Sequence, residues 1–518
     1  MFFSRKNSKT RILFVVLLSS IFISLPIYNS STAQINENIL DAIDSHVVNE
    51  VMKKYVLAPG TSLGIIYNNE TVYLKGYGEA AKDTTMTPDT PLILGSVSKS
   101  FTALAIMQLN ESGQLNLDDS VQDHIPWFTT QNDNYASQIT IRHLIHHLSG
   151  FYRERDSTKN ISLEETVRTS EMDKHLGPPG SLYHYNNFNY QILGYIVEVV
   201  SNQSFSAYIK TNIFDPLNMT NSFLSEYEAK KHGLAQGYVL AFGIPIAANF
   251  IHSLCWNPCS NIISSAEDLT HYMIALMNEG KYGNNSILSP EGMKVLWSKY
   301  EFADQVENYY AYAMGWNNFT MDDTEYIRHS GRAKNFLAEV IMTPKEGWGV
   351  VILHNSHSEL RAMHQTDIGG WNIMRILLDQ PVWLEKLSMK GFFIILDFAY
   401  LIMIVGLGII PFILLRRRIR KLRNEIEEVH KMKKMNLIGI ILSYIAGIFI
   451  LIPLTGIVSN VLSDHWLWFW NKEIWDIPDL VSVSYVIALL FLGLGVYWSF
   501  QYFKGTRNNE EKRLDEEN

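Results

Sequence analysis

Apolar and polar positions in the middle of the chain alternate in ways that predict strands at both ends and helices between them. Segments rich in β-formers occur at SLGIIYNN, TVYLKGYGEA, LAEVIMT and WGVVILHN. The first two flank an Asn68-Asn69-Glu70 turn, which predicts a β-hairpin. An amphipathic helix is expected over 35–56, and an apolar helix over 101–110. This order predicts a mixed α/β (α+β) fold, with an antiparallel sheet built from both chain ends and a helical region between them.

Three long apolar runs follow, over 392–415, 436–461 and 480–503. Each is long enough to cross a hydrocarbon core of about 30 Å as a helix, so the pattern predicts three C-terminal transmembrane helices. The connection after the first run carries nine Lys or Arg and is expected inside. The connection after the second holds four acids, one Lys and four Trp, and is expected outside. These charges place the middle of the chain outside the cytoplasm.

The N-terminal segment has the pattern of an export signal. Basic residues up to Arg11 precede an apolar run over 12–27, and a small polar stretch ends at Ala33, where cleavage is expected. An uncleaved anchor is the alternative. The predicted localisation is the cell membrane, multi-pass, with the lipid bilayer as a partner. The predicted regions are a signal peptide (1–33), an extracytoplasmic domain (34–380), a linker (381–391), a three-helix transmembrane region (392–503) and a cytoplasmic tail (504–518).

Composition and charge narrow the candidate partners. The net charge of −9 argues against nucleic acid. Cys255 and Cys259 are too few for a disulfide framework, and a bridge between them would close a very short loop, so we expect two free thiols. His143, His146 and His147 lie close together, but no carboxylate stands at a recognised metal-ligand spacing. We therefore expect no metal and no cofactor.

Candidate chemistry begins at Ser96-Val97-Ser98-Lys99, which leads into the predicted apolar helix. Residues three apart share a helix face, so Lys99 would lie beside the Ser96 hydroxyl. A serine hydroxyl becomes a good nucleophile when a neighbouring base takes its proton, and a buried lysine of lowered pKa can do this. Free N–H groups at the helix N-terminus would stabilise an oxyanion. The motif alone fits an ordinary helix cap with an exposed lysine equally well.

Two further motifs could complete such a site. Tyr185-Asn186-Asn187 precedes an apolar helix, where a tyrosinate could act as general base beside Lys99 and an Asn side chain could hold a substrate amide. His329-Ser330-Gly331 precedes the strand pattern FLAEVIMT. A small residue and a glycine at a strand edge let the backbone approach a substrate closely and supply a second oxyanion donor.

These blocks together resemble the serine β-lactamase-related family, which includes class C β-lactamases, D-alanyl-D-alanine carboxypeptidases (penicillin-binding proteins) and esterases. The matching runs, in family order, are TPDTPLILGSVSKSFTALAIMQL, TIRHLIHHLSGF, YHYNNFNYQILGYIVE, SSAEDLTHYMIALMNEG and RHSGRAKNF. The resemblance implies a β-lactamase/transpeptidase-like fold. It also implies Ser96 as the acyl-accepting nucleophile, Lys99 as its proton partner, and Tyr185 as the base that protonates the leaving group. The implied substrate-binding residues are Asn187, His329, Ser330, Gly331 and Arg332, with an oxyanion hole from the backbone N–H groups of Ser96 and Arg332.

Two residues depart from the family pattern. His329 stands where lysine is common, which argues against efficient β-lactam hydrolysis and favours the peptidase and esterase branches. Asn335 stands where many relatives have glycine, which predicts a more crowded strand edge.

The predicted function is that of a membrane-anchored serine hydrolase. It would act through a Ser96 acyl-enzyme on D-amino-acid-containing amides or esters of the cell envelope. Substrates of peptidoglycan or teichoic-acid type are expected partners, and β-lactams are further candidate ligands. The alternatives are a broad-specificity esterase and a non-catalytic sensor that binds β-lactams or muropeptides and signals through the three spans.

Overall fold

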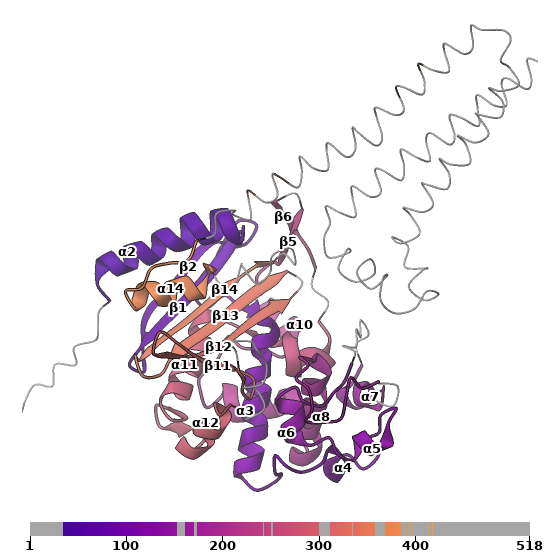
Figure 1. Ribbon diagram of the computed structural model, residues 1–518. Helices are drawn as coiled ribbons and strands as arrows, with labels where there is room; N and C mark the ends of the chain where they lie inside the picture. The colour runs from indigo at the N-terminus through magenta and orange to yellow at the C-terminus, as the bar shows by residue number, and fades with distance from the viewer. Residues whose placement is uncertain are drawn as a thin grey trace, which may run out of the picture. The chain divides into compact units, whose positions relative to one another are not determined.

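The fold is seen in a computed structural model (Figure 1). The structure describes residues 35–152, 161–169, 174–241, 243–249, 252–299, 311–333, 335–357 and 368–384, and the single residues 391, 395, 413 and 417. The chain divides into two units, Met1–Asn36 and Glu37–Asn518. Only residues 35 and 36 of the first unit are described, so the elements below belong to the second.

An eight-stranded antiparallel sheet organises this unit, in the order β10-β11-β12-β13-β14-β1-β2-β3. Strands from the two ends of the domain meet where β14 pairs with β1, with Leu63 opposite Ile352. The predicted sheet built from both chain ends is therefore confirmed. The strands are β1 Gly60–Tyr67, β2 Glu70–Ala81, β3 Thr84–Thr85, β10 Ala311–Tyr312, β11 Asn317–Met321, β12 Thr324–Ala333, β13 Phe336–Thr343 and β14 Trp348–His354.

The predicted hairpin is also confirmed, because β1 and β2 are joined by Asn68 and Asn69 alone. Both residues have positive φ, 48° and 65°. Two consecutive left-handed residues form the tight turn whose twist matches that of paired strands, and Asn tolerates this conformation better than most residues.

Helices cover both faces of the sheet. On one face, Leu337 of β13 joins Val51 and Tyr55 of the π-helix η1 (His46–Tyr55) in an apolar cluster. On the other face, Val340 of the same strand joins the main core with α3 and α11. Figure 1 shows α2 and α14 on the first side and α3 and α11 on the second. Since alternate side chains of a strand point to opposite faces, β13 is buried along its whole length. These helices are α2 Glu37–Ser45, α3 Ser98–Glu111, α11 Ala266–Met277 and α14 Gly370–Leu377.

The buried helix α3 occupies the centre of the helical region. Phe101 stacks on Tyr272 of α11, with ring centroids 4.2 Å apart. The helix also packs against α8 (Asn187–Ser201) and the π-helix η6 (Asn257–Asn261). The remaining helices are α4 Val121–His124, α5 Asp133–Ala136, α6 Ile141–Ile145, α7 Leu163–Arg168, α9 Phe205–Ile209, η4 Lys210–Phe214, α10 Glu226–Lys231, η5 Leu254–Trp256 and α12 Pro290–Leu296.

Short strands complete the described structure. A small sheet combines a parallel pair, β15 with β5, and the β5–β6 hairpin. Strand β4, which pairs with β7, leads directly into the turn that begins α3. The short strands are β4 Leu92–Ile93, β5 Tyr238–Ala241, β6 Ile244–Ala247, β7 Ile263–Ser264, β8 Lys281–Tyr282, β9 Asn285–Ser286 and β15 Ser356–His357.

The membrane part of the predicted fold requires a correction. Within the described parts of the chain, no helix combines the length and apolar character needed to cross a membrane. The longest of these helices, α8, has 15 residues, which is roughly 22 Å at 1.5 Å per residue and short of a hydrocarbon core. This finding contradicts the three predicted transmembrane helices and the multi-pass membrane localisation. Apart from the single residues 395 and 413, the apolar runs within 392–503 lie outside the described residues, as does the predicted signal over 1–33.

Candidate active site

Ser96 and Lys99 lie together at the start of α3. Ser96 is partly exposed on the 3-10 turn η2 (Gly95–Val97), whereas Lys99 is 0% exposed. Lys99 Nζ lies 3.0 Å from Ser96 Oγ, as the spacing of three residues predicts. The alternative of an ordinary cap with an exposed lysine is therefore excluded. Burial beside an accessible hydroxyl is the environment in which a lysine can exchange a proton with a serine.

Two other groups hold the Lys99 amine in place. Nζ donates to the side-chain oxygen Oδ1 of Asn187 at 2.5 Å and to the backbone carbonyl of Cys259 at 2.9 Å. Asn187 is the first residue of α8, and Cys259 belongs to η6. The structure thus brings the predicted Asn187 to Lys99, where its amide oxygen accepts a hydrogen bond.

The end of β12 lies directly against the turn that carries Ser96. A methyl group at Gly331 would stand 1.8 Å from the Leu94 carbonyl oxygen and 3.0 Å from the Ser96 amide nitrogen. A methyl group at Gly95, whose φ is +55°, would stand 2.5 Å from the Arg332 amide nitrogen. Only glycines allow two backbone segments to come this close. The arrangement brings the Ser96 and Arg332 amides, the predicted oxyanion donors, into one region.

Tyr185 lies beside this pair on the irregular segment before α8. Its ring is half-buried, and Lys99 Nζ lies 4.8 Å from the ring centroid and 5.7 Å from that of Tyr190. Cations are attracted to the faces of aromatic rings at such distances. The three chain segments that carry Ser96, Tyr185 to Asn187, and Cys259 therefore converge on one lysine.

The His329-Ser330-Gly331 triplet contributes a neutral ring. His329 Nδ1 lies 2.7 Å from the Ser330 carbonyl, which can only accept, so Nδ1 carries the proton. Nε2 then accepts from the Tyr312 hydroxyl at 3.1 Å. Burial, with the positive charge of Lys99, lowers the pKa of His329 to about 3. The triplet therefore places no positive charge at His329 at neutral pH, whereas the Arg332 side chain is exposed.

Three groups that contact Lys99 or His329 were not predicted from the sequence: the Cys259 carbonyl, Tyr190 and Tyr312. A backbone carbonyl has no residue-type signature. Tyr190 had a usable signal, because it follows Asn187 by three residues on one helix and so shares its face. Tyr312 reaches the group through β10, and no local pattern links it to the other motifs.

Asn335 ties the start of β13 to the β5–β6 hairpin. Its side chain is buried, and Nδ2 donates to the Ala248 carbonyl at 2.9 Å. Gly237 provides the necessary space, because a methyl group there would stand 2.2 Å from that nitrogen. The Asn335 side chain therefore fills space beside the β5–β6 hairpin, next to Gly237 and Ala248.

The predicted thiols and histidines have structural surroundings. Cys255 and Cys259 are both buried and are not joined in a disulfide, so the prediction of two thiols is confirmed. His143 completes a capping box with Thr140 at the start of α6. Burial lowers the pKa of His146 to about 4. Among the residues that the structure describes, no group of three or more His, Cys, Asp or Glu is arranged to hold a metal ion.

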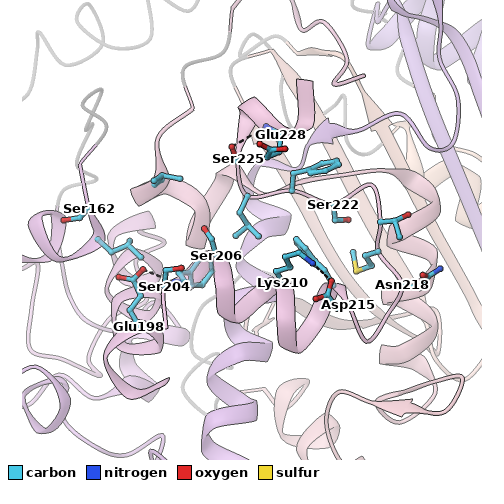
Figure 2. A pocket seen from close by; sticks show the side chains of 18 residues that line it. Ser162, Glu198, Ser204, Ser206, Lys210, Asp215, Asn218, Ser222, Ser225 and Glu228 are labelled. Atoms are coloured by element: carbon cyan, nitrogen blue, oxygen red, sulfur yellow. Dashed lines mark hydrogen bonds and ion pairs between the residues drawn. The ribbon is translucent and has the colours of Figure 1, made fainter. Parts of the chain in front are cut away.

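A separate cavity of about 950 Å³ lies between α7, α9, η4 and the segment 217–225 (Figure 2). Its cationic lining residue, Lys210, is paired with Asp215 at 2.5 Å, as the dashed line in Figure 2 shows. None of the residues that line it belongs to the Ser96 group. The Ser96 group is therefore the better candidate for an active site, because it pairs an accessible hydroxyl with a buried amine.

The fold is that of the β-lactamase and penicillin-binding protein superfamily. The chain belongs to the Beta-lactamase family, whose model matches residues 48–369. This confirms the predicted family. The match lies within the predicted domain over 34–380, whose boundaries stay a prediction.

Individual relatives support the same assignment. The chain is 31% identical over 325 residues to Protein flp of Staphylococcus aureus (strain COL), covering 61% of this chain and 63% of that protein. It is 26% identical over 344 residues to an unguisins hydrolase of Aspergillus campestris, covering 61% and 62%. A solved structure, the octameric penicillin-binding protein homologue from Pyrococcus abyssi, matches with a TM-score of 0.57 and 26% identity over 66% of this chain and 77% of that one. The match spans less than two thirds of the length of these curated relatives.

Proposed function

We propose that the protein is a serine hydrolase that works through an acyl-enzyme on Ser96. The observation that carries this proposal is the buried Lys99 amine, 3.0 Å from the Ser96 hydroxyl oxygen. The Cys259 carbonyl and the Asn187 amide oxygen can only accept, so they take two N–H bonds of the amine. Nζ also lies within hydrogen-bond distance of Ser96 Oγ. When the amine is neutral, a lone pair directed at Ser96 can receive the Ser96 proton.

The proposed reaction has two acyl-transfer steps. Ser96 Oγ forms a bond to the substrate carbonyl carbon as its proton passes to Lys99 or Tyr185. The tetrahedral oxyanion would be stabilised by the Ser96 and Arg332 backbone N–H groups. The leaving amine or alcohol then departs with a proton delivered by Tyr185, which leaves an ester on Ser96. Water attacks this ester through the same groups in reverse order and releases the acid.

We further propose that the substrates are D-amino-acid-containing amides or esters of the cell envelope. Similarity to a penicillin-binding protein homologue supports this class. The test is hydrolysis of a D-alanyl ester and of a D-Ala-D-Ala peptide by wild type and Ser96→Ala, with the L-alanyl ester as a stereochemical control. The proposal predicts D-selective turnover that requires Ser96. Equal rates on both enantiomers would overturn the substrate class, and full activity in Ser96→Ala would overturn the serine mechanism.

A second candidate function, a broad-specificity esterase, is favoured by the state of His329. A lysine at this position would present a fixed positive charge to a substrate carboxylate, whereas the buried, neutral His329 does not. Comparing kcat/KM for p-nitrophenyl acetate with that for a D-Ala-D-Ala peptide separates the two. A strong preference for the short ester would favour the esterase.

A further inference from the structure

His147 holds both neighbours of Tyr185 in the chain. Its backbone carbonyl accepts from the His184 amide at 2.9 Å. Its ring nitrogen Nδ1 lies 3.1 Å from the Asn186 amide nitrogen and 3.1 Å from Asn189 Nδ2. The peptide segment on each side of Tyr185 is therefore fastened to a single residue.

The conformation of His147 is unusual for its residue type. Its φ is +59°, in the left-handed region, and the residue is completely buried. A non-glycine residue in this region costs on the order of 1 kcal/mol and persists where its surroundings enforce it. Here the enforcing contacts include the two backbone hydrogen bonds to the segment that carries Tyr185.

The ring of His147 is neutral and oriented. The Asn186 backbone N–H can only donate, so Nδ1 accepts and the ring proton lies on Nε2. Burial, with the positive charge of Lys99, keeps the pKa of His147 well below its usual value. Among the described residues, Nε2 has no hydrogen-bond partner. A buried N–H without an acceptor is unfavourable, which indicates that other contacts select this residue.

Those contacts are aromatic. The His147 ring centroid lies 4.3 Å from that of Tyr185, at an interplanar angle of 36°. The rings of Tyr312, Tyr190 and Tyr183 surround it at 4.7, 5.2 and 6.1 Å. His147 therefore supports Tyr185 in two ways, through hydrogen bonds to the neighbouring backbone and through its ring. The ring packs on the same Tyr185 phenol that Lys99 contacts.

We propose that His147 is a positioning residue that holds the Tyr185 phenol beside Lys99 and Ser96. This inference rests on the proposed function, in which Tyr185 moves a proton during acyl transfer. It assigns His147 no contact with substrate. Its loss should therefore reduce the rate of the chemical step more than substrate binding.

The test compares His147→Ala with His147→Asn in the full-length protein. An Asn side-chain oxygen can accept in place of Nδ1, and Asn tolerates positive φ. With p-nitrophenyl acetate as the probe, His147→Ala should lower kcat about 100-fold, the effect of roughly 1 Å of misplacement. KM should stay within about threefold of wild type. His147→Asn should recover most of the lost kcat.

A matched control removes another buried histidine. His354 lies in β14, fully buried and hydrogen-bonded to Thr61. His354→Ala should lower the melting temperature as His147→Ala does, but should leave kcat near wild type. A crystal structure of His147→Ala should show Tyr185 displaced from Lys99.

Two results would overturn the inference: a kcat in His147→Ala no lower than in His354→Ala, or an unmoved Tyr185. Failure of the proposed function is a different result, in which Ser96→Ala hydrolyses the probe as fast as wild type. The position of Tyr185 in the His147→Ala crystal structure decides the positioning role in that case too.

Discussion

Replacing Gly331 with alanine tests whether the end of β12 must lie against the turn that carries Ser96. The added methyl group would stand 1.8 Å from the Leu94 carbonyl oxygen and 3.0 Å from the Ser96 amide nitrogen. Both are backbone atoms, so no flexible side chain can move aside. The strand and the turn would have to separate instead.

The size of the effect follows from these distances. Restoring a separation of even 3.0 Å from the carbonyl oxygen requires a shift of about 1.2 Å, and overpacking of this kind costs roughly 1–3 kcal/mol of stability. The same shift parts the Ser96 and Arg332 amides. Loss of one oxyanion donor lowers kcat by about 10²–10³, or roughly 2.7–4 kcal/mol. We therefore expect kcat to fall at least about 100-fold in Gly331→Ala.

The assay is Ser96-dependent ester hydrolysis, with the melting temperature measured on the same sample. Gly113→Ala is the control, because its φ is +70° and nothing lies within 4 Å of the added methyl group. It carries the cost of a left-handed alanine, about 1 kcal/mol, and should keep its activity. A Gly331→Ala enzyme within about twofold of wild-type kcat would refute the proposed oxyanion hole.

Three further predictions concern the amine, a buried ion pair and pH. Lys99→Met should lower kcat by about 10²–10⁴ in steady-state kinetics, since it removes the proposed proton partner, and near-normal turnover would exclude that role. Arg328 pairs with Glu339 at 2.7 Å, with side chains 10% and 2% exposed. Arg328→Met should therefore cost about 3–5 kcal/mol in denaturant unfolding, because it removes the cation that neutralises the buried Glu339 carboxylate, and an unchanged midpoint would contradict this. Burial lowers the pKa values of His329 and His354 to about 3. Below their ordinary value of 6.5, the unfolded chain binds protons that the folded chain does not. The contribution of these histidines to the free energy of unfolding should thus be fully present above pH 6.5. It should fall as pH drops towards 3, by about 1.4 kcal/mol per pH unit for each histidine. Melting temperature against pH measures this, and a flat profile from pH 6.5 to 4 would contradict it.

Local sequence patterns predicted much of the fold. The Asn68-Asn69 turn and the β-former runs around it predict β1 and β2 because strand period and turn chemistry act over a few residues. The pairing of β14 with β1 joins residues nearly 300 positions apart, and it was predictable only as a class of sheet. The amphipathic pattern over 35–56 predicted the helical segment formed by α2 and η1, but not the π-helical form of η1. The β5–β6 hairpin had no comparable signal.

The candidate site likewise combines a contact that local sequence predicts with contacts between distant parts of the chain. Ser96 and Lys99 are one helical turn apart, so their proximity follows from helix geometry. Lys99 also depends on the Cys259 carbonyl, 160 residues further along, and no residue type identifies a backbone acceptor. The prediction of transmembrane helices rested on the length of the apolar runs near the C-terminal end. Among the described helices, none is long and apolar enough to cross a membrane.

The most direct test of the central claim is the intact mass of the protein after rapid mixing with a β-lactam or a D-alanyl ester. An acyl-enzyme on Ser96 predicts a mass increase equal to one acyl group, located by peptide mapping at Ser96 and absent from Ser96→Ala. An adduct of the same mass in Ser96→Ala, or substrate turnover unchanged by that substitution, would contradict it.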